Sequence, residues 1–123
     1  MEYQEFMSGS LTPPSFWVLT TLAGRRRHGY EILTATASAS GGRVALKVTT
    51  LYAALERLER EGLIAADGEE IVSGRARRYY VLTESGSTAL SEEVAALETQ
   101  VRAAREGLAV AGRALARTVV EPA

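Results

Sequence analysis

The sequence has two groups of side chains with the chemistry to bind phosphate. One is a run of three arginines, Arg75, Arg77 and Arg78, and no acidic residue lies from position 72 to position 81. Guanidinium groups form paired, charge-assisted hydrogen bonds with phosphate oxygens. Because a predicted turn precedes Arg75, we expect this residue at an exposed tip with the other two arginines just behind it.

The second group lies at the start of the stretch TTLYAALERLEREGLI, residues 49–64. The polar face of this stretch, read with the residue two places before it, consists of Lys47, Thr49, Thr50, Tyr52, Glu56, Arg57 and Arg60. A helix N-terminus attracts phosphate through its free N–H groups and its dipole. A helix of this size fits the major groove of duplex DNA, where its first side chains reach base edges.

Residues for catalysis or metal binding do not assemble in this sequence. It contains no cysteine, which excludes disulfides, thiolate metal sites and cysteine nucleophiles. Its single histidine, His28, has no partner ligands and no nucleophile arranged beside it. We therefore expect no enzyme activity, no metal and no cofactor, and we expect His28 to cap or hydrogen-bond the helix after it.

Three helices must position these groups. The first begins near Thr12, with two prolines in its first turn, and ends at Gly24. A polar connection, RRRHG, leads to a second helix from about Tyr30 that ends at the glycine pair 41–42. In this second helix we expect Tyr30 and Leu33 to face inward.

The third helix has a regular apolar period. Leu51, Leu55 and Leu58 lie four and three residues apart, which predicts one buried face with Ala54 beside it. Thr49 or Thr50 is expected to cap the start of this helix. Gly62 is expected to cap its end, with the following leucine folding back onto the helix.

Two extended segments follow, at 64–72 and 76–82. A turn at Asp67–Gly68 would leave a first strand of only about three residues, whereas a turn at Ser73–Gly74 gives two strands of ordinary length. We prefer the second turn, with Gly68 as a bulge or kink. Tyr79 and Tyr80 then point to opposite faces, so one is expected in the core.

The last part of the chain predicts a long helix, capped by Thr83, with one apolar stripe. The stripe alternates steps of four and three residues through Leu90, Val94, Leu97, Val101, Ala104, Leu108, Ala111 and Leu115. This spacing is the a/d seam of a coiled coil. No second long helix is predicted, so we expect the same helix of another copy as the partner.

Together these elements predict a mainly α fold with a small β-hairpin, in the α+β class. We expect a winged helix-turn-helix with a long C-terminal dimerisation helix. The expected boundaries are a flexible arm at 1–11, the DNA-binding domain at 12–83, the dimerisation helix at 84–117 and a tail at 118–123.

Three motifs resemble the PadR family of bacterial transcriptional regulators: HGYEI at 28–32, TLYAALERLEREGLI at 50–64 and GRARRYYVLTESG at 74–86. The likeness covers most of the chain from Leu11 onward and is closer to the subfamily with one C-terminal helix. It implies a homodimeric repressor, with residues 48–61 in the major groove and a wing at about 70–78 on the DNA backbone.

The resemblance also implies which residues contact DNA: Tyr30, Thr49, Thr50, Tyr52, Arg75 and Arg77. Lys47 and Arg78 join them as basic neighbours on the same two elements. Many relatives read GTLYPAL where this chain has Thr49 for the glycine and Ala53 for the proline. The hydroxyl and methyl of Thr49 at the groove-facing end can change base preference, so the operator of a relative does not transfer.

Some relatives respond to small aromatic or lipophilic compounds, so the resemblance implies release of the DNA by a ligand of this kind. Trp17, the single tryptophan, is expected in the core; a sharper hypothesis places it beside an apolar space between the first helix and the dimerising helices, where a flat ligand could stack. An alternative function is a dimeric winged-helix module that binds protein and not duplex DNA. The formal net charge of −1 leaves room for this alternative.

The overall composition fits a cytoplasmic protein. The first ten residues, MEYQEFMSGS, are acidic and polar and do not have the pattern of a signal peptide. No apolar stretch approaches the roughly 18 residues of a membrane-spanning helix. We therefore expect double-stranded DNA and a second copy as partners, and no membrane.

Overall fold

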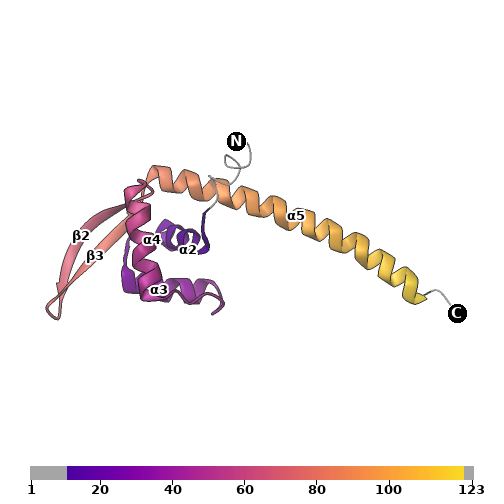
Figure 1. Cartoon of the computed structure of the whole chain (residues 1–123), viewed down its shortest axis with the longest axis horizontal. Coiled ribbons are helices and arrows are strands. Elements are labelled where there is room, and N and C mark those ends of the chain that lie inside the picture. The colour runs from indigo at the N-terminus through magenta and orange to yellow at the C-terminus, as the bar shows by residue number, and fades with distance from the viewer. Residues whose placement is uncertain (1–10, 121–123) are drawn as a thin grey trace. The chain divides into compact units, whose positions relative to one another are not determined.

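The structure, a computed structural model, describes the backbone of residues 11–120 and the side chains of residues 11–118. The expected arm lies outside the described residues except for Leu11, and so do residues 121–123 of the expected tail. Two compact units meet in the sequence between Ser91 and Glu92. In chain order the elements are α2 (Pro13–Gly24), β1 (Arg27–His28), α3 (Gly29–Ala39), α4 (Val48–Arg60), β2 (Ile64–Val72), β3 (Arg75–Leu82) and α5 (Glu84–Val120) (Figure 1).

Helix α2 begins and ends where the sequence predicts. Thr12 is its N-cap: the Ser15 N–H donates to the Thr12 Oγ1 at 3.3 Å, and prolines occupy the first turn. Its buried apolar face consists of Val18, Leu19 and Leu22.

Helix α3 is rotated relative to the prediction. A capping box starts it: the Glu31 N–H donates to the His28 Nδ1 at 3.3 Å, and the His28 N–H donates to the Glu31 Oε1 at 3.1 Å. The expectation that His28 caps a helix is confirmed. The box fixes the helix start so that Ile32 and Thr36 are buried. The expectation that Tyr30 faces inward is wrong, because its side chain is 71% exposed.

Helix α4 has the predicted core face, since Leu51, Ala54, Leu55 and Leu58 are all buried. Its end is also as predicted: the Gly62 N–H donates to the Glu59 carbonyl and the Leu63 N–H to the Leu58 carbonyl, both at 3.0 Å. This pair of bonds, with a positive φ of 78° at Gly62, is a Schellman motif.

The start of α4 differs from the prediction. The N-cap is Lys47, and no side chain caps the helix. Thr49 and Thr50 therefore lie inside the first turn, which the Leu51 N–H closes by donating to the Lys47 carbonyl at 2.9 Å. The expectation that one of these threonines is the cap is wrong, because the cap position falls on Lys47, two residues before Thr49.

The hairpin has the predicted turn. Ser73 and Gly74 both have positive φ, 53° and 76°, which is the conformation of the tight turns that join antiparallel strands. The register of β2 with β3 shifts between Ala66 and Glu69. The interruption contains Gly68, with φ 90°, so the predicted bulge is confirmed.

The RRRHG connection contains a strand that the sequence did not predict. Arg27 and His28 form β1, which pairs antiparallel with Tyr80 and Tyr79 of β3. The hairpin is therefore part of a three-stranded sheet of order β1-β3-β2. Three compact helices, this sheet and the long α5 confirm the winged helix-turn-helix of the α+β class for the described residues.

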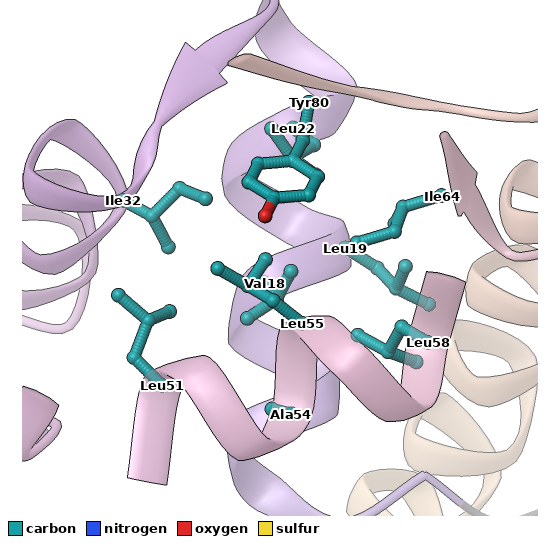
Figure 2. Packing of buried hydrophobic residues seen from close by; sticks show 10 residues of the cluster. All are labelled: Val18, Leu19, Leu22, Ile32, Leu51, Ala54, Leu55, Leu58, Ile64 and Tyr80. Carbon is teal, nitrogen blue, oxygen red and sulfur yellow. The ribbon is translucent and has the colours of Figure 1, made fainter. Parts of the chain in front are cut away.

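The core lies where α2, α3, α4 and the sheet meet. Figure 2 shows the ring of Tyr80 among the aliphatic side chains of the helices. Tyr80 is buried and Tyr79 is half-buried, as their alternation predicts. Burial raises the pKa of the Tyr80 phenol, with Arg78 acting in the opposite direction.

The first turn of α5 is fixed to this core. The Gly86 N–H donates to the Thr83 Oγ1 at 3.0 Å, and the Thr83 hydroxyl donates to the Gly62 carbonyl at 2.7 Å. The predicted cap is confirmed. A Cβ added at Gly86 would lie 2.0 Å from the Leu63 carbonyl oxygen, so only glycine fits there. The helix continues to Val120, past the expected boundary at 117.

Candidate nucleic-acid interface

The first turn of α4 presents an uncapped and polar surface. Lys47 and Thr49 are exposed, and Thr50 is half-buried. Because no side chain caps α4, the N–H groups of its first turn have no side-chain acceptor among the described residues. The first turn of α4 therefore carries N–H groups without a side-chain acceptor, two hydroxyl side chains and one ammonium group, while the opposite face of the helix is buried.

Tyr52 joins this surface to the start of α3. A Cβ added at Gly29 would lie 2.7 Å from the Tyr52 hydroxyl oxygen, so the phenol packs directly against the glycine. Tyr52 is also partly open to solvent, with 52% of the residue exposed. Tyr30 follows Gly29 in the chain and is exposed as well. Tyr52 thus lies against the start of α3, whereas Tyr30 lines a hollow formed by residues of α2 and α3.

Arg57 belongs to the same helix but has a structural role. Its guanidinium donates to the Thr12 Oγ1 at 3.1 Å and to the Ser15 Oγ. These contacts tie the last turn of α4 to the N-terminal end of α2. A shallow hollow lies between the two helices beside Thr49, Thr50 and Ala53.

The arginines of the wing differ in their surroundings. The side chains of Arg75 and Arg77 are exposed, and among the described residues they form no ion pair or hydrogen bond. Arg78 instead donates to a carboxylate oxygen of Glu59 on α4 at 3.1 Å. Its guanidinium lies 5.7 Å from the centroid of the Tyr80 ring.

Acidic side chains also lie closer to these arginines than the linear sequence suggests. The cross-strand partner of Arg77 is Glu70, and that of Arg78 is Glu69. Both glutamates precede the segment that is free of acidic residues, so reading along one strand does not reveal them. The charge of the wing is therefore concentrated near Arg75, which pairs with Val72.

Glu31 is the charged residue at the start of α3. The hydrogen bond from the His28 backbone N–H holds the pKa of the Glu31 carboxyl below its ordinary value of 4.5. Burial acts in the opposite direction, and a hydrogen bond from Arg25 at 3.2 Å lowers the pKa further. The negative charge also suits the positive end of the helix dipole.

The apolar stripe on α5 is exposed in the single chain. Val94, Val101 and Leu108 are 40%, 50% and 72% exposed, and Leu97 is half-buried. A shallow hollow along the helix is lined by Val94, Leu97 and Val101 with charged neighbours. Leu90, in the first unit, packs against the core of its own chain.

Trp17 is half-buried on α2, and its ring meets the edge of Phe16 at 5.3 Å between centroids. It does not line the hollow between α2 and α3, which is formed by residues such as Thr21, Arg27 and Ser38.

No three histidine, cysteine, aspartate or glutamate side chains of residues 11–118 gather where they could hold a metal ion. In that range, none of the helices is both long and apolar enough to cross a membrane.

Residues 18–92 match the model of the transcriptional regulator PadR-like family. The transcriptional regulator Rv3488 of Mycobacterium tuberculosis is 43% identical over 76 residues, which are 62% of this chain and 57% of that protein. This chain thus spans little more than half the length of that relative.

Solved structures show the same fold. A PadR family transcription regulator from Clostridium difficile superposes with a TM-score of 0.66 at 26% identity, covering 79% of this chain and 99% of the other. Bacillus subtilis PadR, solved in complex with operator DNA, superposes with a TM-score of 0.61 at 23% identity, covering 69% of this chain and 48% of the other.

Proposed function

The chain belongs to the PadR-like family of transcriptional regulators, and from that premise we propose that it is a homodimeric repressor that binds operator DNA. The observation that carries this proposal is the first turn of α4. It is uncapped and exposed, and it presents Lys47, Thr49 and Thr50 on a helix whose other face is fully packed. Bacillus subtilis PadR, which shares this fold, has been solved with operator DNA.

In this proposal the two DNA-contacting elements have different roles. Residues 48–61 lie in the major groove, where Thr49, Thr50 and Tyr52 choose the base sequence. The wing, residues 70–78, lies on the backbone, where Arg75 and Arg77 supply attraction to any duplex. Tyr30 and Lys47 add contacts at the edge of the groove. Arg78 contributes less than Arg75 because Glu59 already offsets its charge.

The proposed dimer forms through the stripe on α5. Val94, Leu97, Val101 and Leu108 expose an apolar surface that a second copy of the helix would cover. Leu90 is the first residue of the stripe and packs against the core of its own chain. It would be the first residue of the proposed dimer interface. Two copies would then present two α4 helices to two half-sites.

We also propose that a small aromatic or lipophilic ligand releases the operator by binding near Trp17. The half-buried indole offers a surface on which a flat ring could stack. Because Trp17 is the single tryptophan, a titration with planar aromatic compounds can be followed by its fluorescence. Unchanged emission across a broad panel would remove this part of the proposal.

A second function has specific support in the wing. Glu69 and Glu70 lie opposite Arg78 and Arg77, and the chain carries a formal net charge of −1. A wing with balanced charge suits a winged-helix module that binds another protein. Salt dependence separates the two functions, because phosphate contacts weaken steeply with salt whereas an apolar interface does not.

The deciding experiment is fluorescence anisotropy with the DNA upstream of the protein's own gene and with a random duplex, at two salt concentrations. A repressor binds the first duplex selectively, loses affinity at higher salt and saturates at two chains per site. Thr49→Ala should change the ratio between the two duplexes. If neither duplex binds at low salt, the protein-binding module replaces the repressor.

A further inference from the structure

Arg26 connects the two strands at the base of the wing. Its guanidinium lies over the ring of Tyr79 on β3, with Cζ 4.0 Å from the ring centroid. Its Nη1 donates to the backbone carbonyl of Asp67 on β2 and lies 3.5 Å from a carboxylate oxygen of the same residue. One side chain from outside the hairpin thus contacts both strands at a single level.

That level is the bulge. The register passes from Ala66 opposite Tyr80 to Glu69 opposite Arg78, so Asp67 and Gly68 face the single residue Tyr79. A bulge interrupts the ladder of hydrogen bonds and bends the strand. Arg26 supplies a donor to a carbonyl in this interruption, and a Cβ at Gly68 would lie only 3.5 Å from its Nη1.

Contacts on the other face of the hairpin complete the attachment. The ion pair of Arg78 with Glu59 ties β3 to α4. The pairing of β1 with Tyr79 and Tyr80 also holds β3 at the base. Beyond these attachments, residues 66–71 and 73–78 are exposed. The direction of the wing therefore depends on the contacts at its base.

We propose that Arg26 is a positioning residue for the wing. By joining Tyr79 to the bulge, it fixes the angle at which the wing leaves the domain, and so places Arg75 relative to the first turn of α4. This inference rests on the proposed function, since a fixed wing matters for a duplex that both elements must contact. A wing that is already ordered loses less entropy when it binds.

The ion pair between Arg26 and Asp67 does not carry the proposal alone, because both side chains are about half exposed and such pairs contribute little. The hydrogen bond to the carbonyl and the contact with the aromatic ring add to it, and all three must break together when the wing swings. His28 supports the ring from the side, with centroids 5.3 Å apart.

The first test uses the free protein and needs no DNA. Amide hydrogen exchange of residues 69–78 is compared between the wild type, Arg26→Gln and Arg25→Gln. The Arg25 variant is the matched control, since it removes the same charge one residue away and leaves the bulge intact. We expect faster exchange in the wing for Arg26→Gln alone, with the unfolding temperature of the domain unchanged.

The second test measures operator affinity. Arg26→Gln and Tyr79→Leu should each weaken binding about five- to tenfold, and the double variant should lose no more than either single one. Tyr79→Phe keeps the ring and should bind as the wild type does. If Arg26 instead contacts phosphate directly, its variant lowers the salt dependence by about one counterion and the losses add.

The two tests separate failure of the inference from failure of the function. Unchanged wing exchange in Arg26→Gln overturns the inference whatever the affinity. Faster exchange with unchanged operator affinity overturns the positioning role. If the wild type binds no duplex, the proposed function fails, and with it the role of Arg26 in placing the wing for DNA.

Discussion

The hydroxyl of Tyr52 on α4 packs against Gly29 on α3, at a position where an added Cβ would lie 2.7 Å from the oxygen. The start of α3 therefore packs directly against an exposed side chain of α4, and this close approach depends on the glycine at position 29. A larger residue at this position would have to displace the phenol. The contact links the stability of the domain to the surface proposed to read DNA.

Gly29→Ala should lower the free energy of unfolding by about 1 kcal/mol, because the methyl group overpacks the contact with Tyr52. In a Tyr52→Ala background the same change should cost almost nothing. Urea denaturation of the wild type, the two single variants and the double variant gives the coupling free energy between the two positions. Gly24→Ala is the control, since the nearest atom to its Cβ would be 3.8 Å away. If Gly29→Ala lowered the free energy of unfolding equally with and without the Tyr52 side chain, the contact would not explain its effect.

Gly86→Ala should be more damaging. Its Cβ would lie 2.0 Å from the backbone carbonyl oxygen of Leu63, which cannot move aside as a side chain can. We expect a loss of about 2–3 kcal/mol in thermal or urea unfolding. Gly107→Ala is the matched control on the same helix, because nothing lies within 4 Å of its Cβ in the chain. That change should stabilise the helix by up to about 1 kcal/mol, and a similar loss at both positions would refute the packing explanation.

The folded domain should become less stable in acid through Glu31. Its pKa is lowered in the folded state, chiefly by the hydrogen bond from the His28 N–H, so folding favours the charged form. This contribution is complete above the unfolded-state pKa, near 4.5, and disappears as the pH falls through the lower folded pKa. Urea unfolding across this range should show a shallower acid dependence in Glu31→Gln. Glu56→Gln, on the exposed face of α4, should keep the slope of the wild type.

Local patterns in the sequence predicted local structure well. The spacing of Leu51, Leu55 and Leu58 identified the core face of α4, because burial on one side of a helix repeats every three to four residues. Gly62 and the Ser73–Gly74 turn were equally readable, since both need backbone conformations that few residues adopt. The fold class followed from the order of these elements.

Pairing between distant residues was not predictable in the same way. Strand β1 has only two residues and exists because Arg27 and His28 pair with β3, far along the chain. The glutamates opposite Arg77 and Arg78 likewise depend on the register of the hairpin. The face of α3 was misassigned at Tyr30 because the His28 capping box, and not the apolar period, sets where that helix begins.

Arg75→Ala and Arg78→Ala should separate two kinds of wing arginine. Arg75 forms no ion pair within the described part of the chain, so its removal should weaken binding to operator and random duplex alike. The slope of log affinity against log salt should fall by about 1. Arg78 already shares its charge with Glu59, so its removal should change this slope less. Titrations at several salt concentrations measure both slopes, and equal slopes for the two variants would contradict the assignment.

Val101→Asp tests whether the stripe on α5 forms the dimer. A carboxylate buried between two apolar helices loses its hydration without gaining a partner, so the dimer should weaken by at least about a hundredfold. Val110→Asp is the matched control: Val110 lies on the same helix, off the stripe, and is 58% exposed against 50% for Val101. Both changes have the same effect on helix propensity and on net charge. Sedimentation velocity at micromolar concentration should therefore show monomers for Val101→Asp and dimers for Val110→Asp. Dimers in both variants would place the interface on another surface.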